Sequence, residues 1–220
     1  MLEEEDKNTV STQSAFLSEV REGLLDLITC RRSVRLYHKI KPASSLLDRV
    51  IHCAICAPSA HNSQPWRFYV IDNEAKKTKL IDEMASRFRA DLESDHVPQF
   101  AIEKKIKRSV HLFSFAPVLI VGCIDMADME IYPDSSRQQA EMIMATQSLA
   151  AAIQNLLLAA ETMGLSGCWY CAPLFCPDIV KKVLSLADGH SPQALITLGY
   201  PAEKPEAPRR FGIDEIRFTL

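Results

Sequence analysis

A long stretch without charged residues constrains the fold of this chain more than any other feature. From Met142 to Ala160 there is no charged side chain, and a helical pattern covers about residues 136–163. Such a helix would be roughly 40 Å long at 1.5 Å per residue, and Gly164 favours its end there. A bilayer span has similar length, but five uncharged polar residues interrupt this one: Thr146, Gln147, Ser148, Gln154 and Asn155. We therefore predict a helix buried inside the protein or its oligomer.

The rest of the chain alternates between strand-like and helix-like patterns. Continuous apolar runs predict buried strands at 117–125 and 194–200, and an aromatic, β-branched run predicts a strand at 66–72. Shorter strands are expected at 168–170 and 214–220. Helical spacing covers 18–30, 44–57, 76–92 and 176–186, and more helix is expected within 91–110. Interspersed helices and strands indicate an α/β or α+β class.

Composition and charge narrow the class of protein. The chain has 220 residues, of which 47% are hydrophobic, and a net charge of −3. These values fit one globular domain and do not favour binding to nucleic acid. The acidic, polar N-terminus lacks the pattern of an export signal. We expect a disordered tail at 1–15, a single domain at 16–220, and a cytoplasmic protein with reduced thiols among its seven cysteines.

Two Cys-x-x-Cys pairs raise the question of metal or thiol chemistry. Cys53 and Cys56 lie on a predicted helix, and Cys168 and Cys171 lie in the stretch GLSGCWYCAPLF. Structural zinc pairs usually lie on turns of small modules, whereas the first pair belongs to an apolar helix. More than a hundred residues of core-forming sequence separate the pairs. We expect no metal site, and no thioredoxin-like pair, which would open a helix after a strand.

Common catalytic and nucleotide motifs are absent. The sequence has no GxSxG, HExxH, GxGxxG or P-loop pattern. No side chain is therefore singled out as a catalytic nucleophile or as a catalytic acid or base.

A cationic cluster is more informative. Arg31, Arg32, Ser33 and Arg35 place three guanidinium groups and a hydroxyl within five residues. Guanidinium groups bind phosphate oxygens in a bidentate manner. The same residues could equally be a solvated helix end that complements the helix dipole. A second pair, Arg209 and Arg210, could close on the same anion.

The loop APSAHNSQPWRF is the second informative stretch. Asn62 and Gln64 each offer a donor and an acceptor, and Ser59 adds a hydroxyl. Such a set suits the alternating donor and acceptor edge of a heterocycle better than acid–base work. The alternative is a polar loop that fixes the turn between a helix and a strand.

Taken together, these stretches resemble the nitroreductase family of FMN-dependent oxidoreductases. Four segments carry the resemblance in the family's order: RRSVR, APSAHNSQPWRF, the stretch from Gly164 to Pro173, and LGYPAEKPEAPRR. The match extends from about Leu24 to Arg210. The resemblance implies an α+β homodimer whose central mixed or antiparallel sheet is flanked by helices. It also implies two FMN molecules at the dimer interface, the long helix in that interface, and a C-terminal segment that reaches the partner.

The resemblance also implies roles for individual residues. Arg31, Ser33 and Arg35 would hold the phosphate and ribityl chain of FMN, and Arg32 stands where many members have Arg or His. The flavin would be lined by side chains or backbone of Pro58, Ser59, Ala60, Asn62 and Gln64. Backbone amides of Cys171 and Ala172 would lie near flavin N5, where many members have Glu-Gly instead. Arg209 or Arg210 would complete the phosphate site.

The activity implied by the resemblance is ping-pong reduction of a small-molecule acceptor. NAD(P)H would deliver hydride to flavin N5, and a nitroaromatic, quinone or similar acceptor would then be reduced. A narrower resemblance links the chain to the flavin domain attached to some γ-glutamyl ligases of deazaflavin coenzyme biosynthesis. The alternatives are therefore a dedicated biosynthetic reductase of a dehydro-deazaflavin precursor, a flavin-cleaving enzyme, or a non-catalytic flavin-binding protein.

Overall fold

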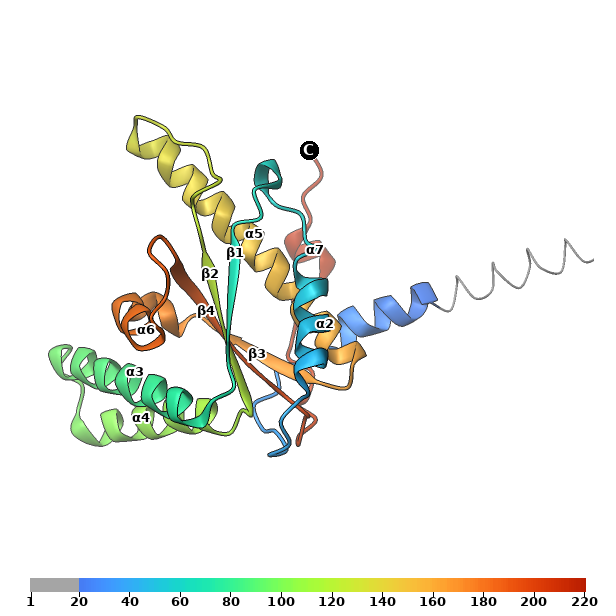
Figure 1. The fold of residues 1–220 in the computed structure, drawn as a ribbon. Coiled ribbons are helices and arrows are strands. Elements are labelled where there is room, and N and C mark those ends of the chain that lie inside the picture. Colours follow the sequence, from blue (N-terminus) through green and yellow to red (C-terminus); the bar gives the residue numbers. More distant parts are fainter. Residues whose placement is uncertain (1–19) are drawn as a thin grey trace, which may run out of the picture. The chain divides into compact units, whose positions relative to one another are not determined.

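A four-stranded antiparallel sheet forms the centre of the larger of two compact units (Figure 1). The computed structural model describes residues 20–220; the larger unit is 33–203, and the described residues of the smaller unit are 20–32 and 204–220. The strands are β1 (Trp66–Ile71), β2 (Val118–Ile124), β3 (Ser166–Tyr170) and β4 (Ser191–Gly199), in the order β1-β2-β4-β3. The α+β class is confirmed, and every pair in this sheet is antiparallel.

Two helices cover one face of the sheet. They are α2 (Ser44–Ala54) and the long α5 (Ser135–Thr162), which confirms the helix predicted at 136–163. Leu149, Ile153 and Leu156 of α5 join a buried cluster with alternate residues of β2 and β4. The helix begins after Asp134, whose side chain accepts a hydrogen bond from the Arg137 N–H. It ends at Gly164, whose φ of +73° favours glycine.

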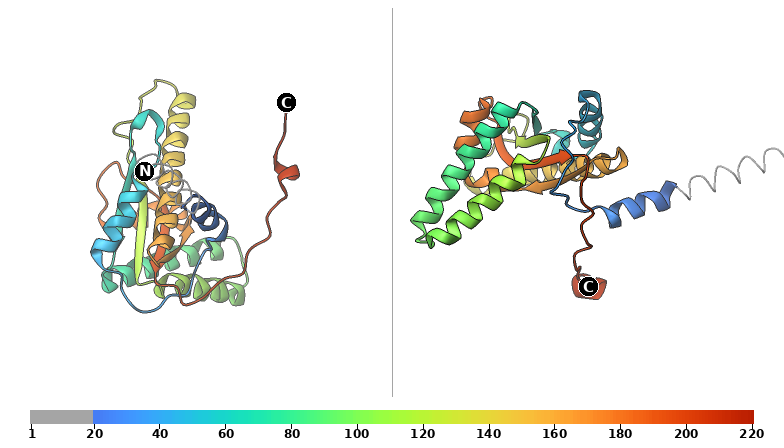
Figure 2. Two further views of the ribbon diagram at one scale, coloured as in Figure 1. Left: turned by 90° about the vertical axis from the view of Figure 1, so that its right-hand side faces the viewer. Right: turned by 90° about the horizontal axis from the view of Figure 1, so that it is seen from below.

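Three helices cover the other face (Figures 1 and 2). They are α3 (Glu74–Ser94), α4 (Gln99–Ser114) and α6 (Pro177–Leu184). Leu119, Val121 and Cys123 of β2 point to this side, opposite to their neighbours Val118 and Ile120. All seven residues of β2 are buried, which explains why its sequence is a continuous apolar run. Burial raises the pKa of the Cys123 thiol to about 12, so this cysteine is a neutral core residue.

The α3–α4 hairpin has a small core of its own. Leu92, Ile102 and Ile106 pack together, and Arg89 of α3 pairs with Glu103 of α4. The hairpin is joined to the sheet at its base, where the buried Lys77 ammonium group donates to the Ala116 carbonyl at 2.8 Å. These contacts fix the hairpin as a unit that extends beyond the sheet.

The ends of the chain depart from the sequence prediction. Residues 214–220, expected as a strand, contain instead the short helix α7 (Ile213–Ile216). The Glu215 carboxylate accepts a hydrogen bond from the Gly212 N–H at 2.7 Å, and Asp214 and Glu215 lie at the helix N-terminus, where acidic residues are favourable. In the smaller unit, residues 20–30 are helical, as predicted. The tail expected at 1–15 lies outside the described residues, and the single domain at 16–220 stays a prediction.

Close packing at the end of β4 makes Gly199 difficult to replace. A Cβ atom there would lie 2.5 Å from Pro117 Cγ and 3.1 Å from Tyr37 Cδ1. Both neighbours are rings, so the backbone must move. We expect Gly199→Ala to lower the free energy of unfolding by about 1–3 kcal/mol, measured by chemical denaturation.

The control is Gly23→Ala, because no heavy atom lies within 4 Å of the added Cβ. That position is helical, so alanine should leave stability unchanged or raise it by up to about 1 kcal/mol. Equal denaturation midpoints for Gly199→Ala and the wild type would show that the packing at β4 is looser than described.

Candidate functional site

The first candidate cluster lies where residues 33–38 run beside β3 and the chain that follows β4. The Val34 N–H donates to the Gly167 carbonyl at 3.3 Å, and the His38 N–H donates to the Tyr200 carbonyl at 2.9 Å. These bonds, with an isolated bridge between Tyr37 and Pro201, fix the backbone that carries Ser33 and Arg35.

Glu203 completes this arrangement and was not singled out from the sequence. Its Oε1 accepts hydrogen bonds from the backbone N–H groups of Arg35 at 2.6 Å and Leu36 at 3.0 Å. Within residues 20–220, the Arg35 guanidinium itself donates only to the Ser33 carbonyl at 3.2 Å. Among the described residues, no carboxylate forms an ion pair with this guanidinium. The carboxylate therefore fixes the backbone and leaves the cation available to an anion.

Two tyrosines with buried hydroxyl groups, Tyr37 and Tyr170, lie next to the 33–38 segment. The Tyr37 hydroxyl bonds to the Val34 carbonyl and to Thr197 Oγ1, the latter at 2.7 Å. Burial raises the pKa of Tyr37, so the phenol stays neutral. Burial also raises the pKa of Tyr170, while the positive charge of Arg35 opposes this shift. The Tyr170 hydroxyl is buried and has no hydrogen-bond partner among the described residues.

Cys171 and Ala172 follow directly after β3. Cys171 is exposed, and Ala172 begins the short 3₁₀ helix η2 (Ala172–Phe175). The first N–H groups of a helix have no partner inside it, so this turn can offer backbone donors to a bound group. The structure thus places Ser33, Arg35, Cys171 and Ala172 along the β3 edge of the sheet.

The second candidate cluster is the loop between α2 and β1. Three non-glycine residues have positive φ, namely His61 (+53°), Asn62 (+53°) and Gln64 (+48°). Such conformations cost about 1–3 kcal/mol each and persist where surrounding structure enforces them, often at functional sites. Ser59 Oγ accepts a hydrogen bond from the Gln64 N–H at 3.1 Å, and the Ala60 N–H donates to Ser148 Oγ of α5 at 3.2 Å.

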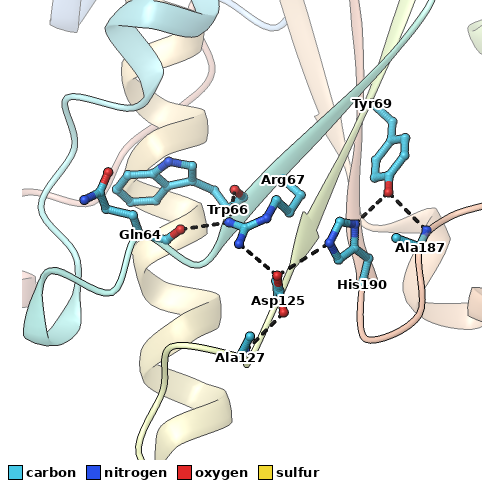
Figure 3. Close-up of polar contacts among 8 residues, drawn as sticks. All are labelled: Gln64, Trp66, Arg67, Tyr69, Asp125, Ala127, Ala187 and His190. Atoms are coloured by element: carbon cyan, nitrogen blue, oxygen red, sulfur yellow. Dashed lines mark hydrogen bonds and ion pairs between the residues drawn. The ribbon is translucent and has the colours of Figure 1, made fainter.

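An ion pair secures the end of this loop (Figure 3). Arg67 donates through Nη1 to the Gln64 carbonyl at 3.1 Å, and through Nη2 to Asp125 Oδ2 at 2.8 Å. Asp125 in turn accepts from the Ala127 N–H at 3.1 Å, and its own N–H donates to the Pro65 carbonyl at 2.8 Å. The strained Gln64 backbone is therefore held by a charge-assisted contact.

His190 and Tyr69 extend the same network (Figure 3). His190 Nε2 lies 3.5 Å from Asp125 Oδ2, and its Nδ1 lies 2.6 Å from the Tyr69 hydroxyl. The Tyr69 oxygen accepts a hydrogen bond from the Ala187 N–H at 3.2 Å, so its own proton can go to His190 Nδ1. In this arrangement His190 Nδ1 is the acceptor, so the imidazole carries its proton on Nε2, which faces Asp125. The network joins β1, the end of β2 and the segment before β4.

A polar cavity of about 530 Å³ opens on this loop. Seven residues line it: His61, Asn62, Ser63, Gln64, Trp66, Arg67 and Asp128. Asn62 and Gln64, both predicted from the sequence, thus meet at one hollow. Pro58, Ser59 and Ala60 precede it in the chain.

The 33–38 segment and the loop between α2 and β1 lie at opposite edges and opposite ends of the sheet. Trp66, which follows the loop, pairs with Ile124, and Ile124 pairs with Ser191. Gly167, which holds the 33–38 segment, pairs with Leu198. Residues 191 to 198 of β4 span about 23 Å at 3.3 Å per residue, and the edge strands β1 and β3 are about 14 Å apart. The sheet and its packed helices fill the space between.

The remaining predicted site residues belong to the smaller unit. Arg32 Nη1 donates to the Thr29 carbonyl at 2.8 Å and the Arg31 carbonyl at 2.9 Å, so it caps the end of the helix at 20–30. This contact supports the helix-end interpretation for Arg32. Arg209 and Arg210 are exposed in an extended segment.

The cysteine pairs are not brought into a metal site. All seven cysteines are free, with Cys168 buried in β3 and Cys171 exposed after it. In the described part of the chain, no group of three or more His, Cys, Asp or Glu residues has the geometry to hold a metal ion.

Comparison with known proteins identifies similar chains. The model of the Nitroreductase family matches residues 28–200. An NADH dehydrogenase of Thermus thermophilus is 27% identical over 212 residues, covering 84% of this chain and 90% of the relative. A 5,6-dimethylbenzimidazole synthase of Rhodospirillum rubrum is 29% identical over 199 residues, covering 90% of each chain.

Solved structures show the same fold. A BluB-like flavoprotein of Clostridium difficile superposes with a TM-score of 0.76 at 25% identity, covering 90% of this chain and 98% of its own. A nitroreductase-type protein of Desulfovibrio desulfuricans, solved in complex with FMN, gives a TM-score of 0.68 at 25% identity, with coverage of 90% and 96%.

The Arg67–Asp125 ion pair should contribute more to the free energy of unfolding than the partial exposure of the Arg67 side chain suggests. Arg67→Met removes the contact to the Gln64 carbonyl and leaves Asp125, whose side chain is only 16% exposed, without its cation. We expect the free energy of unfolding to fall by about 1.5–3 kcal/mol, measured by chemical denaturation.

Arg89→Met is the matched control. The Arg89 side chain is 33% exposed, against 35% for Arg67, but its partner Glu103 is 56% exposed. Exposed ion pairs contribute little, so this variant should be much less destabilised. Equal losses for the two variants would contradict a special role for the Arg67 contact.

Proposed function

The chain belongs to the nitroreductase family, and from this premise we propose that it is an FMN-dependent oxidoreductase that takes electrons from NAD(P)H. The observation that carries the proposal is the Arg35 segment. Glu203 fixes its backbone, and its guanidinium has no carboxylate partner among the described residues. An unneutralised guanidinium on a fixed backbone suits the phosphate group of a bound cofactor.

The donor set around both clusters fits FMN. We assign Ser33 and Arg35 to the phosphate and ribityl chain, and family position extends this assignment to Arg31 and to Arg209 or Arg210. Ser59, Asn62 and Gln64, with the backbone of Pro58 and Ala60, would read the polar edge of the flavin ring. The positive φ values at Asn62 and Gln64 support a loop shaped for a ligand.

The separation of the clusters supports a homodimer. One flavin cannot reach from the loop at the β1 edge to Arg35 at the β3 edge through the sheet and its helices. We therefore assign the two halves of each site to different subunits. The long α5 favours the same arrangement, since Met142 and Ile143 are 41% and 50% exposed on its uncharged surface.

The apolar character of α5 is explained by this interface. The helix is long and apolar enough to cross a membrane by length and composition, and 44% of its apolar window is buried inside the chain. We assign the uncovered surface to the partner subunit instead of to lipid. The free state of all seven cysteines favours a reducing compartment, and we propose the cytoplasm.

A bound FMN would supply the redox chemistry, namely two-electron transfer from NAD(P)H to an acceptor in a ping-pong cycle. The chain's own groups bind and orient. Backbone donors at Cys171 and Ala172 would lie at the reactive edge of the ring, and no acidic or basic side chain is required there. Nitroaromatic and quinone acceptors are the class we expect.

Loss of the phosphate contact should weaken cofactor binding. We expect Arg35→Ala to raise the Kd for FMN by about 10- to 150-fold, which corresponds to about 1.5–3 kcal/mol for a charge-assisted contact. Arg31→Ala should act similarly. Titration of the apoprotein by flavin fluorescence measures the effect, with Lys79→Ala on the exposed surface of α3 as the control. A Kd for Arg35→Ala within twofold of the wild type would remove Arg35 from the site.

Mixed dimers can test whether each site uses two subunits. One chain would carry Arg35→Ala, and the other would carry Asn62→Ala with Gln64→Ala. If the halves come from different subunits, each mixed dimer contains one intact site and one doubly defective site. We therefore expect flavin binding at half of the sites and partial recovery of activity. Recovery no greater than in either variant alone would place both halves in one chain.

A second candidate function is formation of 5,6-dimethylbenzimidazole, which would make the flavin a substrate instead of a cofactor. The similarity to the Rhodospirillum rubrum synthase and to the BluB-like flavoprotein favours it. Aerobic incubation with FMN and NADPH, followed by chromatography, distinguishes the two functions. Accumulated benzimidazole product would favour the synthase, and intact flavin with turnover of an added acceptor would favour the oxidoreductase.

A further inference from the structure

Two adjoining cavities lie between the α3–α4 hairpin and the segment around η2. The first has a volume of about 620 Å³ and includes Cys171 and Ala172 in its lining. The second has a volume of about 420 Å³ and extends between α3 and η2. They share five lining residues: Phe88, Ser109, Phe113, Ala172 and Phe175. The two hollows therefore form one continuous recess beside the Cys171–Ala172 turn.

Aromatic rings dominate the first cavity. Five rings line it: Phe88, Phe113, Trp169, Tyr170 and Phe175. Phe113 and Tyr170 pack edge to face with ring centroids 5.0 Å apart, which fixes this wall. Phe175 is 74% exposed and Phe88 is 37% exposed, so apolar surface remains uncovered at the recess. A planar aromatic molecule is the ligand that such walls favour.

The charged groups of the first cavity have one sign. Lys105 and Arg108 lie three residues apart on α4, next to Ser109, and no carboxylate lines this cavity. Neither cation forms an ion pair with a described residue. An anionic group entering here would meet two cations and a hydroxyl.

The second cavity has the opposite balance. Asp91 and Asp95 line it together with Arg87. The Arg87 guanidinium is paired with Asp91 at 3.0 Å and with Asp178 at 3.4 Å. An anion is therefore favoured at the α4 side of the recess and disfavoured at the α3 side. This difference gives a bound molecule an orientation.

We propose that this recess is the acceptor site and that it selects planar aromatic acceptors carrying an anionic group such as a carboxylate. The ring packs among Phe88, Phe113 and Phe175, and the anion faces Lys105 and Arg108. The inference rests on the proposed function, because that function places the reactive flavin edge at Cys171 and Ala172. For a nitroarene, the first reduction consumes one NAD(P)H and one proton, and it gives a nitrosoarene, NAD(P)⁺ and water.

Lys105→Gln combined with Arg108→Gln tests the charge preference. The acceptors are 4-nitrobenzoate and its neutral counterpart 4-nitrobenzamide. We expect kcat/KM to fall about tenfold or more for the benzoate and to change less than twofold for the benzamide. Lys76→Gln combined with Lys79→Gln removes the same charge from an exposed part of α3 and should change neither value. An unchanged benzoate-to-benzamide ratio in the first double variant would overturn the proposal.

The nicotinamide nucleotide is also an aromatic anion, so its half-reaction is measured separately. Anaerobic bleaching of the flavin by NAD(P)H should proceed at the same rate in the wild type and in the Lys105/Arg108 double variant. If bleaching slows while the acceptor ratio stays constant, the cations serve the nucleotide and the acceptor assignment is wrong. A wild-type protein that binds no FMN, or whose FMN is not reduced, contradicts the proposed function instead.

A binding measurement without turnover tests whether the recess holds the ligand, independently of the proposed function. Equilibrium dialysis of 4-nitrobenzoate against the purified protein should show binding that weakens about tenfold in the Lys105/Arg108 double variant. Ser109→Trp, which fills the region shared by the two cavities, should weaken binding of both nitroarenes in the same dialysis experiment. Equal affinity of the wild type and both variants for 4-nitrobenzoate would exclude this recess as the site.

Discussion

The packing of α5 against the sheet is the contact on which the rest of the molecule depends. Leu149, Ile153 and Leu156 pack on one face of β2 and β4, and Ile153 lies against Gly122 of β2. The same helix reaches the candidate loop, where Ser148 accepts the Ala60 N–H. One surface of α5 thus builds the core and positions the site. Its other surface is uncharged and partly uncovered, which is why we assign it to a second subunit.

In both candidate clusters, a carboxylate network fixes the backbone. It leaves the groups that are candidates for ligand binding available. Glu203 holds the backbone of Arg35 without neutralising its guanidinium. Asp125 holds Arg67, which in turn holds the carbonyl of Gln64 in a loop with three residues at positive φ. The cost of these conformations is offset by charge-assisted hydrogen bonds. A preorganised site reduces the ordering that a ligand must impose on binding.

The recess beside η2 exists because the α3–α4 hairpin has a hydrophobic core of its own. Because Leu92, Ile102 and Ile106 stabilise α3 against α4, the hairpin does not need to close fully on the turn after β3. Aromatic side chains of both parts therefore remain partly exposed, and the cations of α4 face the gap. The second CxxC pair, Cys168 and Cys171, has a simpler explanation than metal or thiol chemistry. Cys168 is a buried residue of β3, and Cys171 contributes its place in a turn next to this recess.

The sequence by itself determined most of the elements and the family, and it proposed several candidate site residues. The uncharged run predicted α5, the continuous apolar run at 117–125 predicted β2, and the family motifs pointed to Arg35, Asn62 and Gln64. Each of these signals is local, because periodicity and motif spacing are set by the geometry of one element. The tertiary structure alone decided the rest. Glu203, the Arg67–Asp125–His190–Tyr69 network and the Lys105–Arg108 recess join segments distant in sequence, and no spacing rule encodes such contacts. It also replaced the strand expected at 214–220 with α7, since a strand requires a partner and a capped helical turn satisfies its own backbone.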